Sequence, residues 1–296
     1  MTLVPRVVVV TRPTPYEELL ARHATRSQAE FFLKQRGQTL ASVEALHHDI
    51  HAAVARVQAA IPLSYRRNLV PRHELDRFLF EPEDTVVVVG QDGLVANVAK
   101  YLDGQPVIGV NPTPRQFDGV LVRHSPEQAC RLLVPSSRHD VDAERRTMVE
   151  ITLDDGQRLC ALNELFLGQR THQSARYELS FKDEQARHSS SGIIVATGTG
   201  ATGWARSIQL ERHAAIELPE PQERRLAFFV REAFPSVATS TELTQGTLVD
   251  GDTLRIVSRM EDGVVFGDGM EADHLRFEWG LRAEVRIADR RLFLVK

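Results

Sequence analysis

The stretch Asp84–Leu102, DTVVVVGQDGLVANVAKYL, decides the fold of the first half of this chain. Four consecutive valines, Val86–Val89, predict a strand that is buried on both faces, as in a parallel sheet. The turn Gly90–Gly93 breaks this run, and apolar residues at helical spacing follow it. A strand, a glycine turn and a helix in this order present backbone N–H groups to an anion, usually a phosphate.

Asp92 is an unusual residue for such a turn, because a carboxylate repels phosphate. It therefore needs another role, such as holding a metal ion or accepting a proton from a hydroxyl that attacks a phosphate. An Asp-Gly turn without any chemistry is the alternative interpretation. The stretch by itself gives the two interpretations equal weight.

Length and composition are those of a soluble globular protein with two domains or one large domain. The chain has 296 residues, of which 42% are hydrophobic and 26% charged. No apolar run approaches the roughly 20 residues of a membrane span, and the N-terminal sequence does not have the pattern of a secretory signal. Cys130 and Cys160 are too few for a disulfide framework, so we expect a cytoplasmic protein. The net charge of −4 argues against nucleic-acid binding.

Other apolar runs extend the predicted sheet. Arg6–Thr11 and Pro106–Val110 are predicted to be parallel strands, and repeated strand–helix–strand units predict a doubly wound α/β fold. Ligands of such folds gather at the carboxyl ends of the strands. Arg12 follows the first strand and is a candidate phosphate contact, although a solvated loop arginine is the favoured interpretation.

A long helix is predicted from Leu40 to Ile61, with Thr39 as its N-cap and Pro62 ending it. His47 and His51 lie one turn apart on this helix, which is a spacing that can bind zinc. No glutamate follows His47 and the sequence shows no third ligand. A solvated polar face is therefore the favoured interpretation, and we predict no metal ligand.

The sequence changes character near residue 125. Short alternating segments predict a β-rich second half with little helix apart from Trp204–Ala215. The predicted domains are an α/β nucleotide-binding domain at residues 1–125 and a β-rich domain at residues 126–296.

Two polar stretches of the second half are candidate ligand contacts. Asn163 and Glu164 interrupt an apolar run, and a buried amide or carboxylate needs partners that the hydroxyls of a ligand would supply. A satisfied polar pair at a strand end has equal weight. The stretch Thr197–Trp204, TGTGATGW, offers bare backbone, hydroxyls and the ring face of Trp204 to a nucleotide. Here a flexible loop is the less favoured alternative.

These stretches together resemble the signatures of the NAD kinase family. The family has a GGDG turn, an asparagine–acid pair and a Thr/Gly-rich segment that ends in an aromatic residue. The chain is most similar to the mitochondrial type of NAD kinase, in the segments Pro106–Asn111, Ala161–Gly168, Ser190–Trp204 and Val230–Phe234. The resemblance covers roughly half of the chain in the ordered blocks 6–16, 84–124, 159–207, 225–240 and 264–269.

The resemblance implies that a phosphoryl group passes from ATP, another triphosphate or polyphosphate to the 2′-hydroxyl of the NAD adenosine ribose. It implies Mg²⁺ as the companion of ATP, Asp92 as the catalytic group that activates the hydroxyl, and a homodimer or homotetramer with the second, β-sandwich-like domain in its interface. Implied phosphate contacts are Gly90, Gln91, Arg12 and Asn111. Implied NAD contacts are Gly93, Asn163, Glu164, Thr199, Gly200, Thr202 and Trp204.

Two positions depart from the family pattern on the side of the donor phosphates. Gln91 replaces the second glycine of GGDG, and Leu94 replaces the threonine that follows the motif. A catalytically silent protein that binds NAD or NADP is therefore the main alternative. A lipid kinase shares the turn, but the second-half blocks and the lack of a basic amphipathic membrane face count against it. A dehydrogenase is least favoured, because no GxGxxG follows the early strands.

Overall fold

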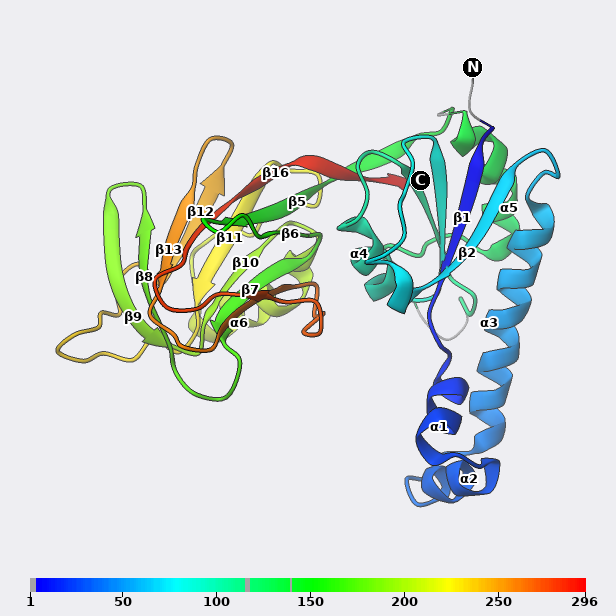
Figure 1. Ribbon diagram of the computed structural model, residues 1–296, viewed down its shortest axis with the longest axis horizontal. Coiled ribbons are helices and arrows are strands. Elements are labelled where there is room, and N and C mark those ends of the chain that lie inside the picture. Colours follow the sequence, from blue (N-terminus) through cyan, green and yellow to red (C-terminus); the bar gives the residue numbers. More distant parts are fainter. Residues whose placement is uncertain (1–3, 115–117, 139) are drawn as a thin grey trace. The chain divides into compact units, whose positions relative to one another are not determined.

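The computed structural model describes residues 4–114, 118–138 and 140–296. Residues 115–117 of the similarity block 84–124, and the first three residues of the predicted first domain, lie outside the described residues. The chain forms two compact units (Figure 1). The first comprises residues 1–144 and 293–296, and the second comprises Arg145–Leu292.

The first unit is built on a parallel sheet. The strands β2 (Arg66–Pro71), β1 (Arg6–Thr11), β3 (Asp84–Val89) and β4 (Pro106–Val110) lie in this order, and the end of β16 pairs with β4. Every residue of β3 and β4 is buried, as expected for β-branched runs covered on both faces. The predicted central strands of a parallel sheet are confirmed.

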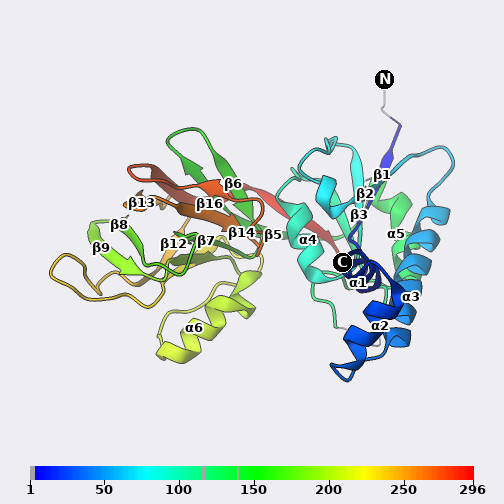
Figure 2. The same cartoon turned by 60° about the horizontal axis from the view of Figure 1, so that its bottom comes forward.

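Helices cover both faces of this sheet. The helices α3 (Leu40–Ala60) and α5 (Pro126–Ser137) lie on one side, where they share a core with the valines of β1 and β3. The helix α4 (Asp92–Ala99) lies on the opposite side (Figure 2). The predicted doubly wound α/β fold is therefore confirmed.

The helix α3 extends beyond the carboxyl end of β1, and two short helices pack against this part of it (Figure 1). They are α1 (Pro15–His23) and α2 (Arg26–Lys34). Thr39 caps α3 by accepting a hydrogen bond from the N–H of Ser42, as its sequence predicts. The 3₁₀ turn η1 (Arg72–Glu74) follows β2.

The second unit consists of antiparallel strands that enclose an apolar core. One sheet has the order β12-β11-β10-β7-β14-β15, and the other contains β9, β8, β13 and β16, with β5 pairing β16 and β6. The strands are β5 (Ala143–Leu153), β6 (Arg158–Ala161), β7 (Glu164–Gln169), β8 (Ala175–Phe181), β9 (Glu184–Ser190), β10 (Ile193–Ala196), β11 (Arg225–Val230), β12 (Gln245–Val249), β13 (Leu254–Ser258), β14 (Gly263–Gly267), β15 (Leu275–Arg276) and β16 (Arg282–Val295). This arrangement confirms the β-rich second part.

One helix of the second unit, α6 (Trp204–Arg212), packs on the outer face of the sheet that contains β10 and β11 (Figure 2). Ala205 and Ile208 of α6 contact Ile194, Ala196 and Phe229 there. The 3₁₀ turn η2 (Gly200–Thr202) precedes the helix. In the ranges 4–114, 118–138 and 140–296, no helix is both long and apolar enough to cross a membrane.

The boundary between the units lies between Glu144 and Arg145 rather than after residue 125. The reason is α5, which the sequence analysis did not predict and which packs on the sheet of the first unit through Ala129 and Leu133. The final strand, β16, runs without a break from Arg282 to Val295, and its last residues belong to the first unit.

Candidate functional site

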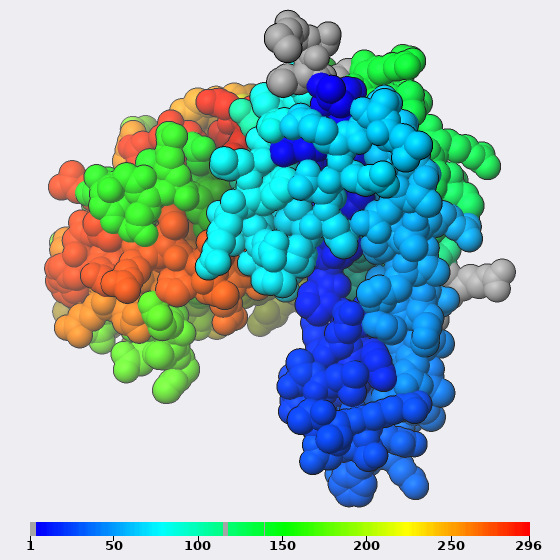
Figure 3. Space-filling view, turned by 45° about the vertical axis from the view of Figure 1, so that its right-hand side comes forward, coloured from blue at the N-terminus to red at the C-terminus, as the bar shows by residue number. Residues whose placement is uncertain are grey.

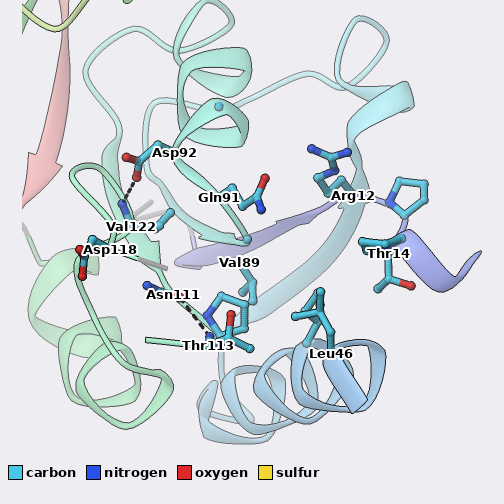
Figure 4. Close-up of a pocket in the computed structure, with 16 residues that line it drawn as sticks. Arg12, Thr14, Leu46, Val89, Gln91, Asp92, Asn111, Thr113, Asp118 and Val122 are labelled. Carbon is cyan, nitrogen blue, oxygen red and sulfur yellow. Dashed lines mark hydrogen bonds between the residues drawn. The ribbon is translucent and has the colours of Figure 1, made fainter. Parts of the chain in front are cut away.

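A cavity of about 350 Å³ opens at the carboxyl ends of β1, β3 and β4 in the first unit. It is lined by every first-unit residue that the sequence analysis assigned to a site: Arg12, Gly90, Gln91, Asp92, Gly93 and Asn111. Figure 4 shows how Arg12, Gln91, Asp92 and Asn111 surround it. Parallel strands end together at this edge, which brings side chains far apart in the sequence to one place.

The turn after β3 begins at a glycine with an unusual backbone conformation. Gly90 has a φ of +157°, which L side chains rarely adopt. Gln91 is the N-cap of α4 and has an ordinary extended backbone with a φ of −107°. A glutamine is therefore accommodated without strain where the family has glycine. Asp92 and Gly93, the first two residues of α4, line the cavity, whereas the N–H of the third, Leu94, donates to Gln91 O at 2.9 Å.

The Asp92 carboxylate is held by the loop that follows β4. Its Oδ2 accepts a hydrogen bond from the N–H of Val120 at 3.0 Å. Its Oδ1 accepts from the N–H groups of Leu121 at 2.8 Å and Val122 at 2.9 Å. Asp92 is also the first residue of α4, where the helix dipole favours a negative charge. The carboxylate is thus fixed in one orientation at the edge of the cavity.

The loop that holds Asp92 is itself packed directly on the backbone of β4. A Cβ added to Gly109 would lie 2.0 Å from the carbonyl oxygen of Leu121. The loop is also tied by two backbone bonds, from the Asn111 N–H to His124 O and from the His124 N–H to Gly109 O. The position of Asp92 therefore rests on the rigid sheet rather than on a free loop.

The other predicted phosphate contacts differ in their surroundings. Arg12 is half-buried and forms an ion pair with Glu18 at 3.3 Å. Asn111 is buried, and its Oδ1 accepts a hydrogen bond from the N–H of Thr113 at 3.0 Å. Leu94 is 2% exposed and lies in the apolar interior, so it offers nothing to a phosphate.

In the second unit, Asn163 lies at the junction of β6 and β7 and not within a strand. The Asp268 carboxylate holds this junction by accepting hydrogen bonds from the N–H groups of Leu162 at 2.9 Å and Asn163 at 2.6 Å. Asp268 has a positive φ of 55°, and its own N–H donates to the carbonyl of Glu164. The pair Asn163–Glu164 is therefore part of a constrained polar corner.

Glu164, at the start of β7, has a carboxyl group with an unusually high pKa. Burial, and secondly the negative charge of Asp268, raise the pKa of Glu164 to about 7. Near neutral pH this side chain exists in both protonation states. It can therefore donate or accept a hydrogen bond.

This shift predicts a pH-dependent stability. The ordinary pKa of Glu164 is 4.5, so between that pH and about 7 the folded chain binds more protons than the unfolded chain. We expect the free energy of unfolding to fall over this window by up to roughly 3 kcal/mol as pH rises. Urea denaturation of Glu164→Gln at several pH values should lack this fall. The control Glu184→Gln, at an exposed carboxylate of β9, should retain it; equal slopes in both variants would contradict the prediction.

The segment Thr197–Trp204 is an ordered loop in contact with this corner. The Thr197 hydroxyl donates to Leu162 O and accepts from the N–H groups of Thr199 at 3.1 Å and Gly200 at 3.3 Å. A Cβ on Gly200 would lie 2.2 Å from Asn163 O, so the two backbones touch. The structure thus brings together the two polar stretches that the sequence analysis singled out in this half.

The remaining predicted NAD contacts follow in the same loop. Thr199 Oγ1 accepts a hydrogen bond from Arg146 at 3.4 Å, and Thr202 is exposed. The Trp204 ring packs parallel to Phe166, with centroids 5.8 Å apart, and the Arg231 guanidinium lies 4.6 Å from the ring centre. Protein groups therefore already contact the ring that was expected to receive a base.

Several residues that shape these sites were not predicted, namely Asp118, Val120–Val122, Arg146, Arg231 and Asp268. Asp268 had a usable signal, because the sequence Gly267-Asp268-Gly269 follows a predicted strand in the same way as the Gly90 turn. The backbone donors Val120–Val122 had none, because an N–H group leaves no mark on the sequence.

Comparison with known proteins gives several relatives. Human mitochondrial NAD kinase 2 is 29% identical over 264 residues, which cover 72% of this chain and 60% of the human protein. An NAD kinase of Caldicellulosiruptor saccharolyticus is 27% identical, with 71% of this chain and 76% of that protein covered. The chain spans 60% of the human protein and 62% of its rat counterpart. No protein-family model matches the chain.

Solved structures share the fold. An NAD kinase from Archaeoglobus fulgidus in complex with ATP superimposes with a TM-score of 0.59 at 20% identity, covering 98% of this chain and 93% of that one. Yeast NADH kinase in complex with NADH gives the same TM-score at 14% identity, covering 99% and 84%.

An α/β unit with a cavity at its strand ends, followed by a β-rich unit, defines the architecture of this chain. Within this architecture, the chain is similar to NAD kinases in sequence and shares the fold of solved NAD and NADH kinases. The resemblance to NAD kinases that the sequence motifs predicted is confirmed.

Proposed function

We propose that this protein is an NAD kinase, which transfers a phosphoryl group from ATP to the 2′-hydroxyl of the adenosine ribose of NAD and so makes NADP. The observation that carries the proposal is the Asp92 carboxylate, fixed beside a helix N-terminus at the edge of the cavity. Its neighbours bind phosphate, and Asp92 itself is suited to accept a proton.

The lone pairs of Asp92 define what it can still do. An ionised carboxylate offers about four lone-pair sites. The backbone N–H groups occupy two on Oδ1 and one on Oδ2. The remaining site on Oδ2 would accept the hydrogen bond of the ribose hydroxyl and then its proton. The hydroxyl oxygen would attack the terminal phosphorus of ATP, the bond from that phosphorus to the bridging oxygen would break, and ADP would leave.

Binding of the donor phosphates is assigned to the turn and its surroundings. The N–H groups at the start of α4, with Gly90 and Gln91, would contact phosphate oxygens, and Arg12 and Asn111 lie on the same cavity. The cavity also contains a carboxylate, that of Asp118, which suits Mg²⁺. This cation prefers oxygen ligands and is usually bound by one or two carboxylates together with substrate phosphates and several waters. Asp118 would hold the Mg²⁺ that accompanies ATP and neutralises its charge.

In the second unit, we assign NAD binding to the polar corner and its loop. Asn163 and Glu164 would hydrogen-bond the hydroxyls of the dinucleotide, and Glu164 can do so as donor or acceptor because its pKa is about 7. Thr199, Gly200 and Thr202 would contact the ribose, and Gly93 serves the same substrate in the first unit. Trp204 would flank the adenine, with Phe166 and Arg231 setting the position of its ring.

A homodimer or homotetramer formed by the β-rich unit is part of the proposal. Phe234 is 64% exposed and Val237 is fully exposed in the segment after β11, and such apolar side chains are typical of contact surfaces. We also propose a cytoplasmic location, which the two free cysteines fit. Size-exclusion chromatography with light scattering tests the assembly; a monomer at micromolar concentration would contradict it.

A catalytically silent NAD- or NADP-binding protein is the second candidate. The observation that favours it is the donor side of the turn, where the Gln91 side chain is exposed at the cavity and Leu94 is buried. Neither supplies the hydroxyl that the family places near the donor phosphates.

One experiment separates the two candidates. The purified protein is incubated with NAD⁺ and MgATP, other triphosphates or polyphosphate, and the product is detected with an NADP-specific dehydrogenase. The kinase produces NADP with at least one donor. The silent binder produces none with any donor, while NAD or NADP still raises the melting temperature.

A further inference from the structure

Two histidines and a glutamate come together on the helical part of the first unit, beside the loop that carries Arg12. Glu17 of α1 and His47 and His51 of α3 each offer a ligand atom, and these atoms lie within 4.8 Å of one another. The helices α1 and α3, in dark and lighter blue, lie side by side on the surface in Figure 3. The histidine pair is visible in the sequence but the third ligand is not, because Glu17 and His51 are 34 positions apart.

Neighbouring groups hold these side chains in place. Thr14, which is 2% exposed, forms a hydrogen bond between its hydroxyl and His47 Nδ1 at 2.8 Å. The N–H of Thr14 donates to Glu17 Oε2 at 2.7 Å in a capping box at the start of α1. The other oxygen, Oε1, is then directed at His51, whose Nε2 lies 3.2 Å away. Such outer contacts orient ligands in metal sites.

We propose that Glu17, His47 and His51 form a Zn²⁺ site. Two histidines and a glutamate are an established ligand set for zinc, and three protein ligands leave a fourth position open. Glu17 and His51 also line a cavity of about 500 Å³ beside the cluster, so a water or small anion can reach that position. The alternative to a metal site is a simple hydrogen bond between His51 and Glu17. That bond alone would not require a ring nitrogen of His47 to lie near the other two ligand atoms.

The site has a structural consequence for the loop between β1 and α1. Zn²⁺ would tie α1 to α3, and Thr14, which orients two of its ligands, lies in the same loop as Arg12. Both residues line the cavity at the strand ends. Occupancy by zinc would therefore restrain the part of the loop that carries Arg12.

The test is a Zn²⁺ titration of the full chain, prepared without a polyhistidine tag and stripped with a chelator. Calorimetry in competition with a chelator should give one Zn²⁺ per chain. His47→Ala and His51→Ala should each weaken binding at least about tenfold, because each leaves two ligands. His48→Ala is the matched control, since His48 is on the same helix but donates its Nδ1–H to Glu44 O at 2.7 Å; it should bind as the wild type does.

Spectroscopy of the cobalt-loaded wild-type chain is a second test, which does not require any variant to fold. Co²⁺ in place of Zn²⁺ should give visible absorption bands typical of four or five ligands, and added Zn²⁺ should abolish them. Equal zinc affinity in wild type, His47→Ala and His51→Ala, or no stoichiometric binding below millimolar Zn²⁺, would overturn the proposal. Neither measurement uses NADP formation, so the outcome is independent of the proposed kinase activity.

Discussion

Replacing Asp92 with asparagine is expected to slow NADP formation by about 10²- to 10⁴-fold, the usual contribution of a positioned general base. The asparagine has the same shape but cannot take the proton of the ribose hydroxyl. Its NH₂ group would also face backbone N–H groups that now donate to the carboxylate. The measurement is kcat at saturating NAD⁺ and MgATP.

The same substitution also disturbs the loop that holds Asp92, so stability must be measured beside activity. Loss of a hydrogen bond to a charged acceptor costs about 1.5–3 kcal/mol. Assays should therefore run well below the melting temperature of the variant, with circular dichroism showing that it is folded. Asp103→Asn is the matched control, because Asp103 is exposed after the end of α4; it should leave kcat unchanged. A folded Asp92→Asn protein with kcat within about threefold of wild type would show that the carboxylate only braces the loop.

Replacing Gly200 with alanine should destabilise the second unit by about 3 kcal/mol and abolish NAD binding. The added Cβ would lie 2.2 Å from the oxygen and 2.6 Å from the carbon of the Asn163 carbonyl. Both are backbone atoms, and the same carbonyl accepts the hydrogen bond of the Thr197 N–H, so the whole corner must shift. Urea denaturation and NAD titration measure the two effects.

Gly93→Ala is the stability control for this substitution. A Cβ at Gly93 meets no heavy atom within 4 Å, and alanine favours the helix in which Gly93 lies. Its free energy of unfolding should stay at or above that of the wild type. Gly200→Ala protein with wild-type stability and NAD affinity would mean that the loop can move away from Asn163 without loss.

The sequence predicted those parts of the fold in which burial leaves a pattern. The valine runs of β1 and β3 are apolar throughout because both faces are covered, and α3 has a clear apolar period and an N-cap. The edge strand β2, Arg66–Pro71, was missed because most of its side chains are exposed and no period-two pattern develops. The helix α5 has a start signal in Pro126 and the capping box of Ser125 and Gln128, but Pro135 lies inside it and obscures the helical pattern.

The candidate site shows the same division. The turn at Gly90 and the loop before Trp204 have local signatures, and the structure places each at a polar site within its own unit. The partners of Asp92 could not be predicted, because they are backbone N–H groups up to 30 positions away. The gathering of Glu17 with His47 and His51 depends on how α1 packs on α3, which no local spacing encodes.

The most direct test of the proposed activity is a ³¹P NMR spectrum of NAD⁺ and MgATP incubated with the purified protein. We expect a new phosphomonoester signal, coupled to the 2′ proton of the adenosine ribose, that grows as the γ-phosphate signal of ATP declines. An unchanged spectrum from protein whose melting temperature NAD raises in a saturable manner would contradict the kinase and leave a protein that only binds the dinucleotide.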